Sequence, residues 1–535
     1  MSRRVGLCLA FRDMWQSSRS CFPSVSQLRE MAYAIAAMGC FDRVEASGGA
    51  FEQVCLMQGE NPNRAVREFC APLNAAGIKT QMLERGLNAL RLSPLPADIR
   101  ELMFKVKASQ GVDISRSFCG LNDHRNFRLS IEYAKAAGMV SQVALPIADS
   151  PVHTIDHYMR VVGHAVKYGC DEICVKDMSG QGDPSFIAEL IRRIKAAYQG
   201  IFVQYHSHCS CSSSRESLLE AVRAGADCVD VALGPLAGGA GHPEVLEVVQ
   251  WLRSDGFAVK DIDMEAYRRL VSFVEDSLSA ADSSAGSSRV MTDGARDDAD
   301  AAEILRAAGL PGGMMPSLLN ELSAYHSAVN RALDPLSSAS SVSAGLPVSS
   351  DLVDSPKLTF RQFLVRFSDE LKSVWPALGY PPMVTPFSQY VANAALSNLL
   401  SQAKGQPRWS GLSSDVWNMI LGRMGQLPGE LDSSLVALAE EKGLAFYDGD
   451  PQQLYPDALD LYRAKMLAEG WSAGPDDEEL LEFAMHESRY RDYMSAHFSA
   501  LPEHSGIHLS ASVSVSQDNA VYAAIAMALH EFCGH

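Results

Sequence analysis

Two histidines separated by one residue, His206 and His208, end an apolar run and could act together as metal ligands. Side chains alternate along a β-strand, so the two imidazoles would point the same way, one layer apart. Asp13 ends another apolar run near the N-terminus and adds a carboxylate. This mixture of nitrogen and oxygen ligands suits a divalent ion such as Zn²⁺, Mn²⁺ or Co²⁺. We therefore predict one metal site that contains Asp13, His206 and His208.

Lys176 lies inside a third apolar run, where a lysine is costly to bury unless it is paired or modified. Taken alone, each signal is weak: a lone His-x-His often binds no metal, and the Arg12–Asp13 pair alone would suggest a surface ion pair. Their coincidence at the ends of apolar runs favours one shared site, with Lys176 as its fourth ligand.

Short apolar runs that alternate with amphipathic stretches would position these side chains. The eight runs cover residues 5–11, 41–46, 79–83, 112–118, 140–145, 172–178, 201–206 and 228–233. Eight strand–helix units predict a closed (β/α)₈ barrel, whose catalytic groups lie at the C-terminal ends of its strands. An open doubly wound sheet is the alternative, although no Gly-x-Gly-x-x-Gly motif follows the first run.

The bulk composition indicates a multidomain globular protein. The chain has 535 residues, of which 47% are hydrophobic and 21% charged. A net charge of −18 disfavours nucleic acid and anionic membrane surfaces as partners. The 12 cysteines include no Cys-x-x-Cys pair, which favours reduced thiols and a cytoplasmic location. The first apolar run is too short for a signal peptide, and we expect no membrane span.

Changes of composition divide the chain into four predicted parts. The barrel covers residues 1–275, a Ser/Ala/Asp-rich link covers 276–305, a mainly helical domain covers 306–480, and a C-terminal extension covers 481–535. A second serine-rich run, 337–350, has no periodicity and is typical of a loop. His530, Cys533 and His535 in the tail could bind metal, but a frayed end is the simpler interpretation.

Motifs along most of the chain resemble one family in its own order. Within the barrel they are residues 11–17 (FRDMWQS), 81–89 (QMLERGLNA), 174–180 (CVKDMSG) and 224–232 (AGADCVDVA); beyond it they are 310–313 (LPGG), 378–386 (LGYPPMVTP) and 421–429 (LGRMGQLPG). The chain resembles the family that contains the carboxyltransferase subunit or domain of pyruvate carboxylase, the oxaloacetate decarboxylase alpha subunit and the pyruvate-acting transcarboxylase subunit. This resemblance implies a barrel followed by a helical, conserved carboxylase-type domain that packs on the barrel mouth.

The resemblance also implies a ligand set and partners. Asp13, His206, His208 and a carbamylated Lys176 would hold the metal. Gln16 and Arg85, with Arg12 beside them, would bind a 2-oxo acid such as pyruvate or oxaloacetate. No Met-Lys-Met biotinylation motif is present, so biotin would come from a separate biotinyl carrier protein, with a biotin carboxylase subunit as a further partner. We expect a homo-oligomer.

Several positions depart from the family pattern. Ala240 stands where the family has the threonine thought to relay a proton between substrate and biotin, and His242 stands where it has glutamine. Cys119 and Cys209 each replace an aspartate. We expect His242, whose ordinary pKa suits proton transfer, to take over the relay, with Cys209 as a second candidate catalytic group.

These features predict a metal-dependent, biotin-dependent carboxyltransferase subunit. The first alternative is a biotin-independent lyase or condensing enzyme of the hydroxymethylglutaryl-CoA lyase type. The second is a catalytically impaired scaffold or regulatory paralogue, which Ala240 would explain. A different metal site, a thiolate zinc site made of His206, His208, Cys209 and Cys211, is also open.

Overall fold

The structure is a computed structural model that describes residues 2–18, 22–284, 301, 304–305, 310, 315–333 and 357–498. Its contacts divide the chain into Met1–Tyr493 and Met494–His535, and only residues 494–498 of the second unit are described. The predicted loop at 337–350 and the tail residues His530, Cys533 and His535 therefore lie outside the described residues. No helix in the described ranges has the length and apolar character needed to cross a membrane.

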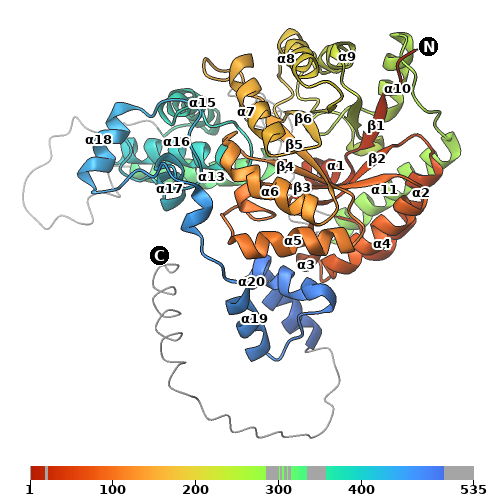
Figure 1. Cartoon of the computed structure of the whole chain (residues 1–535). Helices are drawn as coiled ribbons and strands as arrows, with labels where there is room; N and C mark the ends of the chain where they lie inside the picture. The colour runs from red at the N-terminus through yellow and green to blue at the C-terminus, as the bar shows by residue number, and fades with distance from the viewer. Residues whose placement is uncertain are drawn as a thin grey trace, which may run out of the picture. The chain divides into compact units, whose positions relative to one another are not determined.

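Eight parallel strands form a closed barrel (Figure 1). They are β1 Gly6–Leu9, β2 Arg43–Gly48, β3 Lys79–Glu84, β4 Ile114–Phe118, β5 Val140–Pro146, β6 Glu172–Asp177, β7 Phe202–Ser207 and β8 Cys228–Val231. Each strand lies in one of the eight predicted runs, give or take one or two residues at its ends. Because β1 pairs with β8, for example Leu7 with Val229, the sheet has no edge, and the alternative of an open doubly wound sheet is wrong.

Helices surround the barrel between successive strands. They are α1 Phe11–Ser18, α2 Val25–Ala37, α3 Phe51–Met57, α4 Pro62–Ala75, α5 Ala97–Ser109, α6 His124–Ala136, α7 Ile155–Lys167, α8 Pro184–Ala197, α9 Ser214–Ala224 and α10 Val245–Ser254, with short 3₁₀ turns η1 Gly86–Asn88 and η2 Gly234–Leu236. Polar residues begin several of them. Ser24 forms a capping box with Gln27, and Thr154 and Asp183 cap α7 and α8 through their side-chain oxygens.

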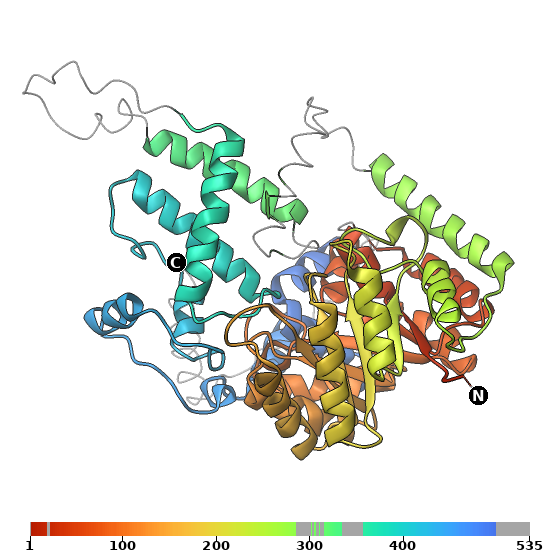
Figure 2. The ribbon, with the colours of Figure 1, turned by 90° about the horizontal axis from the view of Figure 1, so that it is seen from above.

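The barrel domain ends later than the composition indicates. Helix α11, Met264–Ser284, continues past residue 276, where we predicted a flexible link (Figure 2). Leu270 and Val274 are fully buried, and the Ser277 hydroxyl accepts a hydrogen bond from Gln27 in α2, 3.2 Å away. The predicted link at 276–305 therefore begins with helix up to Ser284, and most of its remaining residues lie outside the described ranges.

The second half of the chain is helical, as predicted. Its helices are α13 Met315–Ala332, α15 Phe360–Ala377, α16 Phe387–Ala403, α17 Ser414–Ile420, α18 Ser433–Glu441, α19 Leu459–Ala468 and α20 Glu478–Phe498, with the 3₁₀ turns η5 Pro451–Leu454 and η6 Pro475–Asp477. Val384, just before α16, packs against side chains from four strands: Leu83, Phe118, Ala144 and Cys174. Gly120, after β4, leaves room for the ring of Phe387, because an added Cβ would lie 2.4 Å from that ring. These contacts confirm that the helical domain packs on the barrel mouth.

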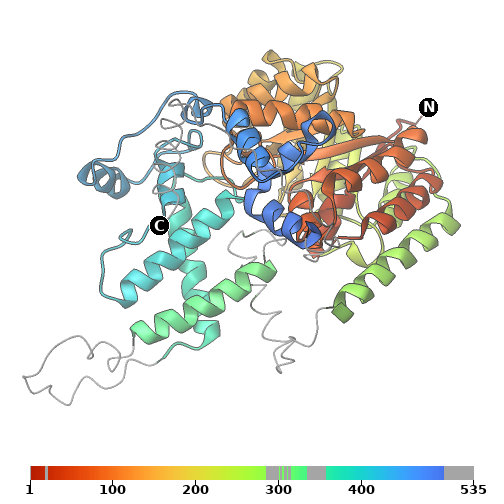
Figure 3. The ribbon, with the colours of Figure 1, turned by 90° about the horizontal axis from the view of Figure 1, so that it is seen from below.

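Helix α20 returns to the outside of the barrel (Figures 1 and 3). Lys107 of α5 lies 3.2 Å from Glu52 of α3 and 3.4 Å from Glu482 of α20, and all three side chains are buried. Glu478 also pairs with Arg67 of α4. The predicted boundary between residues 480 and 481 therefore falls inside one helix, whose buried charges join it to the barrel helices.

Glu84 at the end of β3 is fully buried, and this burial raises its pKa from 4.5 to about 7, although Arg100 opposes the shift. Between pH 4.5 and 7 the unfolded chain loses this proton while the folded chain keeps it. The contribution of Glu84 to the free energy of unfolding is therefore highest at low pH, falls as the pH rises towards 7 and then levels off. We expect Glu84→Gln to raise the free energy of unfolding by about 3 kcal/mol at most at pH 8, and by little at pH 4.5.

Urea unfolding at the two pH values measures this difference. Glu265→Gln, at an exposed position of α11, is the matched control and should behave as the wild type does. Equal stability of Glu84→Gln and wild type at pH 8 would contradict the prediction.

Candidate metal centre

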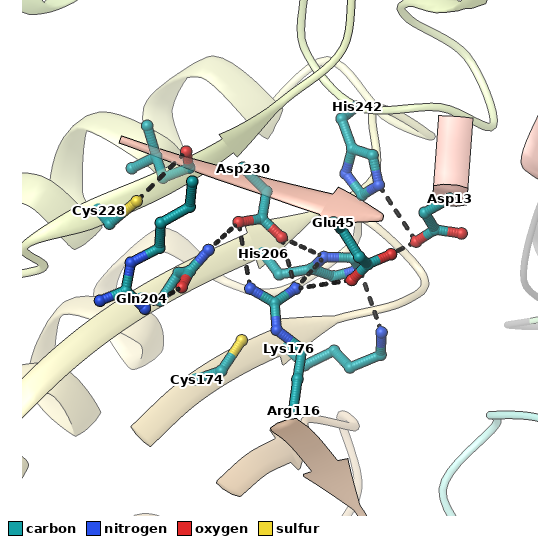
Figure 4. A network of polar contacts seen from close by, with 12 residues as sticks. Asp13, Glu45, Arg116, Cys174, Lys176, Gln204, His206, Cys228, Asp230 and His242 are labelled. Carbon is teal, nitrogen blue, oxygen red and sulfur yellow. Dashed lines mark hydrogen bonds and ion pairs between the residues drawn. The ribbon is translucent and has the colours of Figure 1, made fainter. Parts of the chain in front are cut away.

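Four buried side chains converge at the C-terminal end of the barrel. They are Asp13, the third residue of α1; His206, in β7; His208, just after β7; and His242, in the loop between η2 and α10. One ligand atom from each lies within 4.8 Å of the others. Figure 4 shows His242 facing Asp13 across the end of β1. Asp13 lies in a helix, not at the end of a strand, but the helix begins directly after β1 and places its carboxylate at the mouth.

The spacing of these atoms fits a coordinated ion. Oδ2 of Asp13 lies 3.2 Å from Nε2 of His242, 3.5 Å from Nε2 of His206 and 3.6 Å from Nε2 of His208. A tetrahedral ion with bonds near 2.0–2.1 Å separates its ligand atoms by about 3.3–3.4 Å. The four side chains are therefore preorganised at metal-binding distances.

Each histidine uses its other ring nitrogen to hold its orientation. Nδ1 of His208 donates to the carbonyl of Ala240 at 2.6 Å, and Nδ1 of His242 donates to the carbonyl of Ser207 at 2.9 Å. Carbonyls only accept, so both rings carry a proton on Nδ1 and turn Nε2 towards the cluster. Nε2 of His208 is buried and has no hydrogen-bond partner among the described residues. A buried, unpartnered ring nitrogen that faces a carboxylate and two further imidazoles fits a metal site.

His206 is held by a buried carboxylate. Its Nδ1 lies 2.7 Å from Oδ2 of Asp230, and its Nε2 lies 3.2 Å from Nζ of Lys176. An ammonium only donates, so Nε2 accepts and Nδ1 carries the proton towards Asp230. A carboxylate behind a histidine fixes its tautomer and raises its strength as a metal ligand.

Arg116 keeps that carboxylate ionised. Its guanidinium lies between Asp230 and Glu45, 2.6 Å and 3.4 Å from their carboxylate oxygens, and all three side chains are inaccessible to solvent (Figure 4). Burial alone would raise the pKa of Asp230, but Arg116 and His206 hold it well below its usual range. These three residues were not predicted from the sequence. The sequence did contain one signal for them, which is the alternation of side chains along each strand. It places these charged residues at positions that face the barrel interior, where each charge needs a partner.

Lys176 borders the cluster from β6. It is buried, and this burial lowers its pKa although Asp13 and Glu45 oppose the change. Its ammonium also lies 5.6 Å from the centre of the Phe118 ring. Lys176 therefore lies close to the histidines, as predicted, and its carbamylation stays a prediction.

The three residues predicted to bind substrate lie around Gly49, after β2. Nη1 of Arg85 donates to the carbonyl of Gly49 at 3.2 Å, and a Cβ added to Gly49 would lie 2.9 Å from Oε1 of Gln16 and 2.8 Å from Nη1 of Arg12. Arg12 is largely committed within the protein, because it pairs with Glu45 and donates to Gln16. Arg85 instead donates to backbone carbonyls, and no carboxylate of the described residues forms an ion pair with it.

The cysteines take no part in the cluster. Sγ of Cys211 donates to the carbonyl of Gly180 at 2.6 Å, and the Cys209 thiol contacts the side chain of Ser214. Within the described residues, the metal-binding group contains neither thiol, so the alternative of a thiolate zinc site is wrong. Burial raises the pKa of Cys209 and of Cys119 to about 11, which keeps both thiols protonated at neutral pH and argues against Cys209 as a catalytic base.

The orientation of His242 bears on its predicted role as a proton relay, which stays a prediction. Because Nδ1 donates to Ser207 and Nε2 faces Asp13, neither nitrogen is directed at a substrate position outside the cluster. The backbone of residue 240 has a structural role, since its carbonyl orients His208, and this role does not depend on the threonine side chain that Ala240 lacks.

Two family models match the chain. A model described as HMGL-like matches residues 12–274, which contain the whole cluster, and one described as Conserved carboxylase domain matches residues 361–525. The two matches cover most of the closed barrel, including its cluster, and most of the helical domain that follows it.

Known proteins share this organisation over most of the chain. A pyruvate carboxylase subunit of Methanocaldococcus jannaschii is 28% identical over 507 residues, covering 92% of this chain and 78% of the relative. The methylmalonyl-CoA carboxyltransferase 5S subunit of Propionibacterium freudenreichii subsp. shermanii is 26% identical, covering 90% and 86%. The carboxyl transferase domain of Rhizobium etli pyruvate carboxylase with pyruvate shares the fold, with a TM-score of 0.74, 20% identity, and coverage of 94% and 79%. The chain is thus similar over most of its length to these carboxyltransferase subunits, the resemblance that its motifs indicated.

We expect the purified protein to bind one divalent ion per chain, because four ligands are held in place before the ion arrives. Elemental analysis after incubation with Zn²⁺, Mn²⁺ or Co²⁺ measures the stoichiometry. His206→Ala/His208→Ala should bind close to none, whereas His164→Ala, a half-buried histidine outside the cluster, should bind as the wild type does. Undiminished metal in the double variant would contradict this assignment.

Proposed function

We propose that the chain is a metal-dependent, biotin-dependent carboxyltransferase subunit that acts on a 2-oxo acid of the pyruvate class. It would move a carboxyl group between carboxybiotin on another chain and the substrate, with oxaloacetate as the carboxylated form of pyruvate. The observation that carries this proposal is the cluster of Asp13, His206 and His208 at a barrel mouth against which a carboxylase-type domain packs. A bound divalent ion would supply Lewis acidity towards the oxo group of the substrate.

Arg85 supports a negatively charged substrate. Its guanidinium is buried beside Gly49, and burial together with Arg12 lowers its pKa to about 10, so it stays charged at neutral pH. A buried cation without a carboxylate partner in the described structure fits the carboxylate of a 2-oxo acid, to which arginine donates two parallel hydrogen bonds. Gln16 also lies beside Gly49, and its amide could donate to the oxo group.

The partners and location belong to the same proposal. Biotin would be delivered by a biotinyl carrier protein and recharged by a biotin carboxylase subunit, and we expect the chain itself to form a homo-oligomer. The ten cysteines of the described residues are all unpaired, which supports a reducing compartment such as the cytoplasm.

We expect Arg85→Ala to weaken binding of pyruvate or oxaloacetate roughly 30- to 1000-fold, because it removes a charged contact worth about 2–4 kcal/mol. Isothermal titration of the metal-loaded protein measures the affinity. Arg85→Lys keeps the charge but not the planar fork and should lie between the two, and the exposed Arg64→Ala is the control. Equal affinity of wild type and Arg85→Ala would show that the carboxylate binds elsewhere.

The activity itself is tested by oxaloacetate decarboxylation with free biotin or a biotinyl carrier. We expect turnover that needs both metal and biotin, and a rate about 100-fold higher in Ala240→Thr, because a hydroxyl restores proton transfer within hydrogen-bond reach. Pyruvate formation is followed with lactate dehydrogenase and NADH.

Each other outcome favours a specific alternative. Equal turnover without biotin favours a biotin-independent lyase. A silent wild type that Ala240→Thr activates favours a scaffold or regulatory paralogue. No turnover in either protein, with metal bound, would count against carboxyl transfer.

A further inference from the structure

His242 occupies the position of a metal ligand. It is fully buried, and Nε2 lies 3.2 Å from Oδ2 of Asp13, nearer than Nε2 of His206 or His208. The rings of His206 and His208 both have their centres 4.5 Å from that of His242. The third histidine is therefore a full member of the cluster.

The loop that carries His242 is held by a hydrogen bond within the loop and by another to the segment after β7. The carbonyl of His242 accepts from the amide of Gly238 at 2.8 Å, and the carbonyl of Gly241 accepts from the amide of Cys209 at 2.8 Å. Gly241 is required for this turn, since a Cβ there would lie 2.5 Å from the carbonyl of Leu236. Together with the bond from Nδ1 to Ser207, these contacts hold the ring in one orientation without a metal ion.

The charges of the cluster favour an ion among these four groups. Nε2 of three histidines and one carboxylate oxygen lie close together in a buried space, a set of nitrogen and oxygen donors that a divalent cation would bind. Three imidazoles and one carboxylate would complete the four ligands that an ion such as Zn²⁺ commonly takes from a protein. The set is thus sufficient without a contribution from Lys176.

We propose that His242 is the fourth protein ligand of the metal ion and replaces a carbamylated Lys176 in that role. This inference rests on the metal centre of the proposed function. With His242 as the ligand, metal binding does not depend on carbon dioxide, and Lys176 stays an unmodified amine beside His206. Its chemical basis is that neutral imidazole, unlike lysine, needs no covalent modification to become a ligand at neutral pH.

Metal binding with and without bicarbonate tests the proposal. The full-length chain is stripped with a chelator and titrated with Zn²⁺ or Co²⁺ in buffer purged of carbon dioxide, and again with ¹³C-bicarbonate. We expect the wild type to bind one ion per chain with equal affinity in both buffers and to show no ¹³C carbamate signal. Lys176→Gln should bind with nearly wild-type affinity, whereas His242→Gln, which restores the family residue, should bind about 100-fold more weakly or only with bicarbonate.

X-ray absorption on the loaded wild type gives a count that does not depend on the folding of any variant. We expect three imidazoles around the ion in the wild type and two in His242→Gln, with His164→Gln as the control at three. A wild type that needs bicarbonate, a carbamate signal on Lys176, or two imidazoles in the wild type would overturn the proposal. A wild type that binds no ion in either buffer would instead remove the metal centre on which the proposed function depends.

Discussion

The ion pair between Arg116 and Asp230 in the middle of the barrel is the interaction on which the cluster at the mouth depends. Both side chains have no solvent access, so neither charge can be stabilised by water. Removing one partner of such a pair commonly costs about 3–5 kcal/mol, because the other charge stays buried. The pair also has a directional effect: it keeps Asp230 ionised behind His206 and so presents Nε2 of that ring to the cluster. The polar interior of this barrel therefore both positions the site and restricts how the strands can be substituted.

The helical domain closes the space above this interior. Val384 packs onto Leu83, Phe118, Ala144 and Cys174, and Asn126 of α6 donates to the carbonyl of Met424 at 2.8 Å. Excluding water in this way strengthens the electrostatic interactions beneath it, since charges interact more strongly where the local dielectric constant is low. Helix α20 adds a second attachment at the outer helices through Lys107 and Glu482. The barrel and the helices after it thus form one site, although they are far apart in sequence.

The geometry shows that the departures from the family pattern at Ala240, His242 and Cys209 have different structural consequences. Ala240 loses a hydroxyl, but its backbone carbonyl still orients His208, so the cluster does not require the lost side chain. His242 turns inwards, and Cys209 turns towards Ser214. Of these changed positions, His242 therefore lies in the cluster, while Cys209 contacts the first residue of α9.

Periodicity and spacing in the sequence were sufficient to predict the eight strands, the barrel, the shared direction of His206 and His208 and the approximate place of Asp13. These features follow from local alternation and from the rule that parallel strands end at one face. Tertiary structure alone decided that α11 continues through a serine-rich stretch and that α20 packs on the barrel helices. It also decided the direction of His242, Cys209 and Cys211, because the conformation of a loop depends on contacts with residues distant in sequence, such as Ser207 for His242 and Gly180 for Cys211. Local sequence determines which side chains are available at the mouth, and the packing of the loops determines which of them face one another.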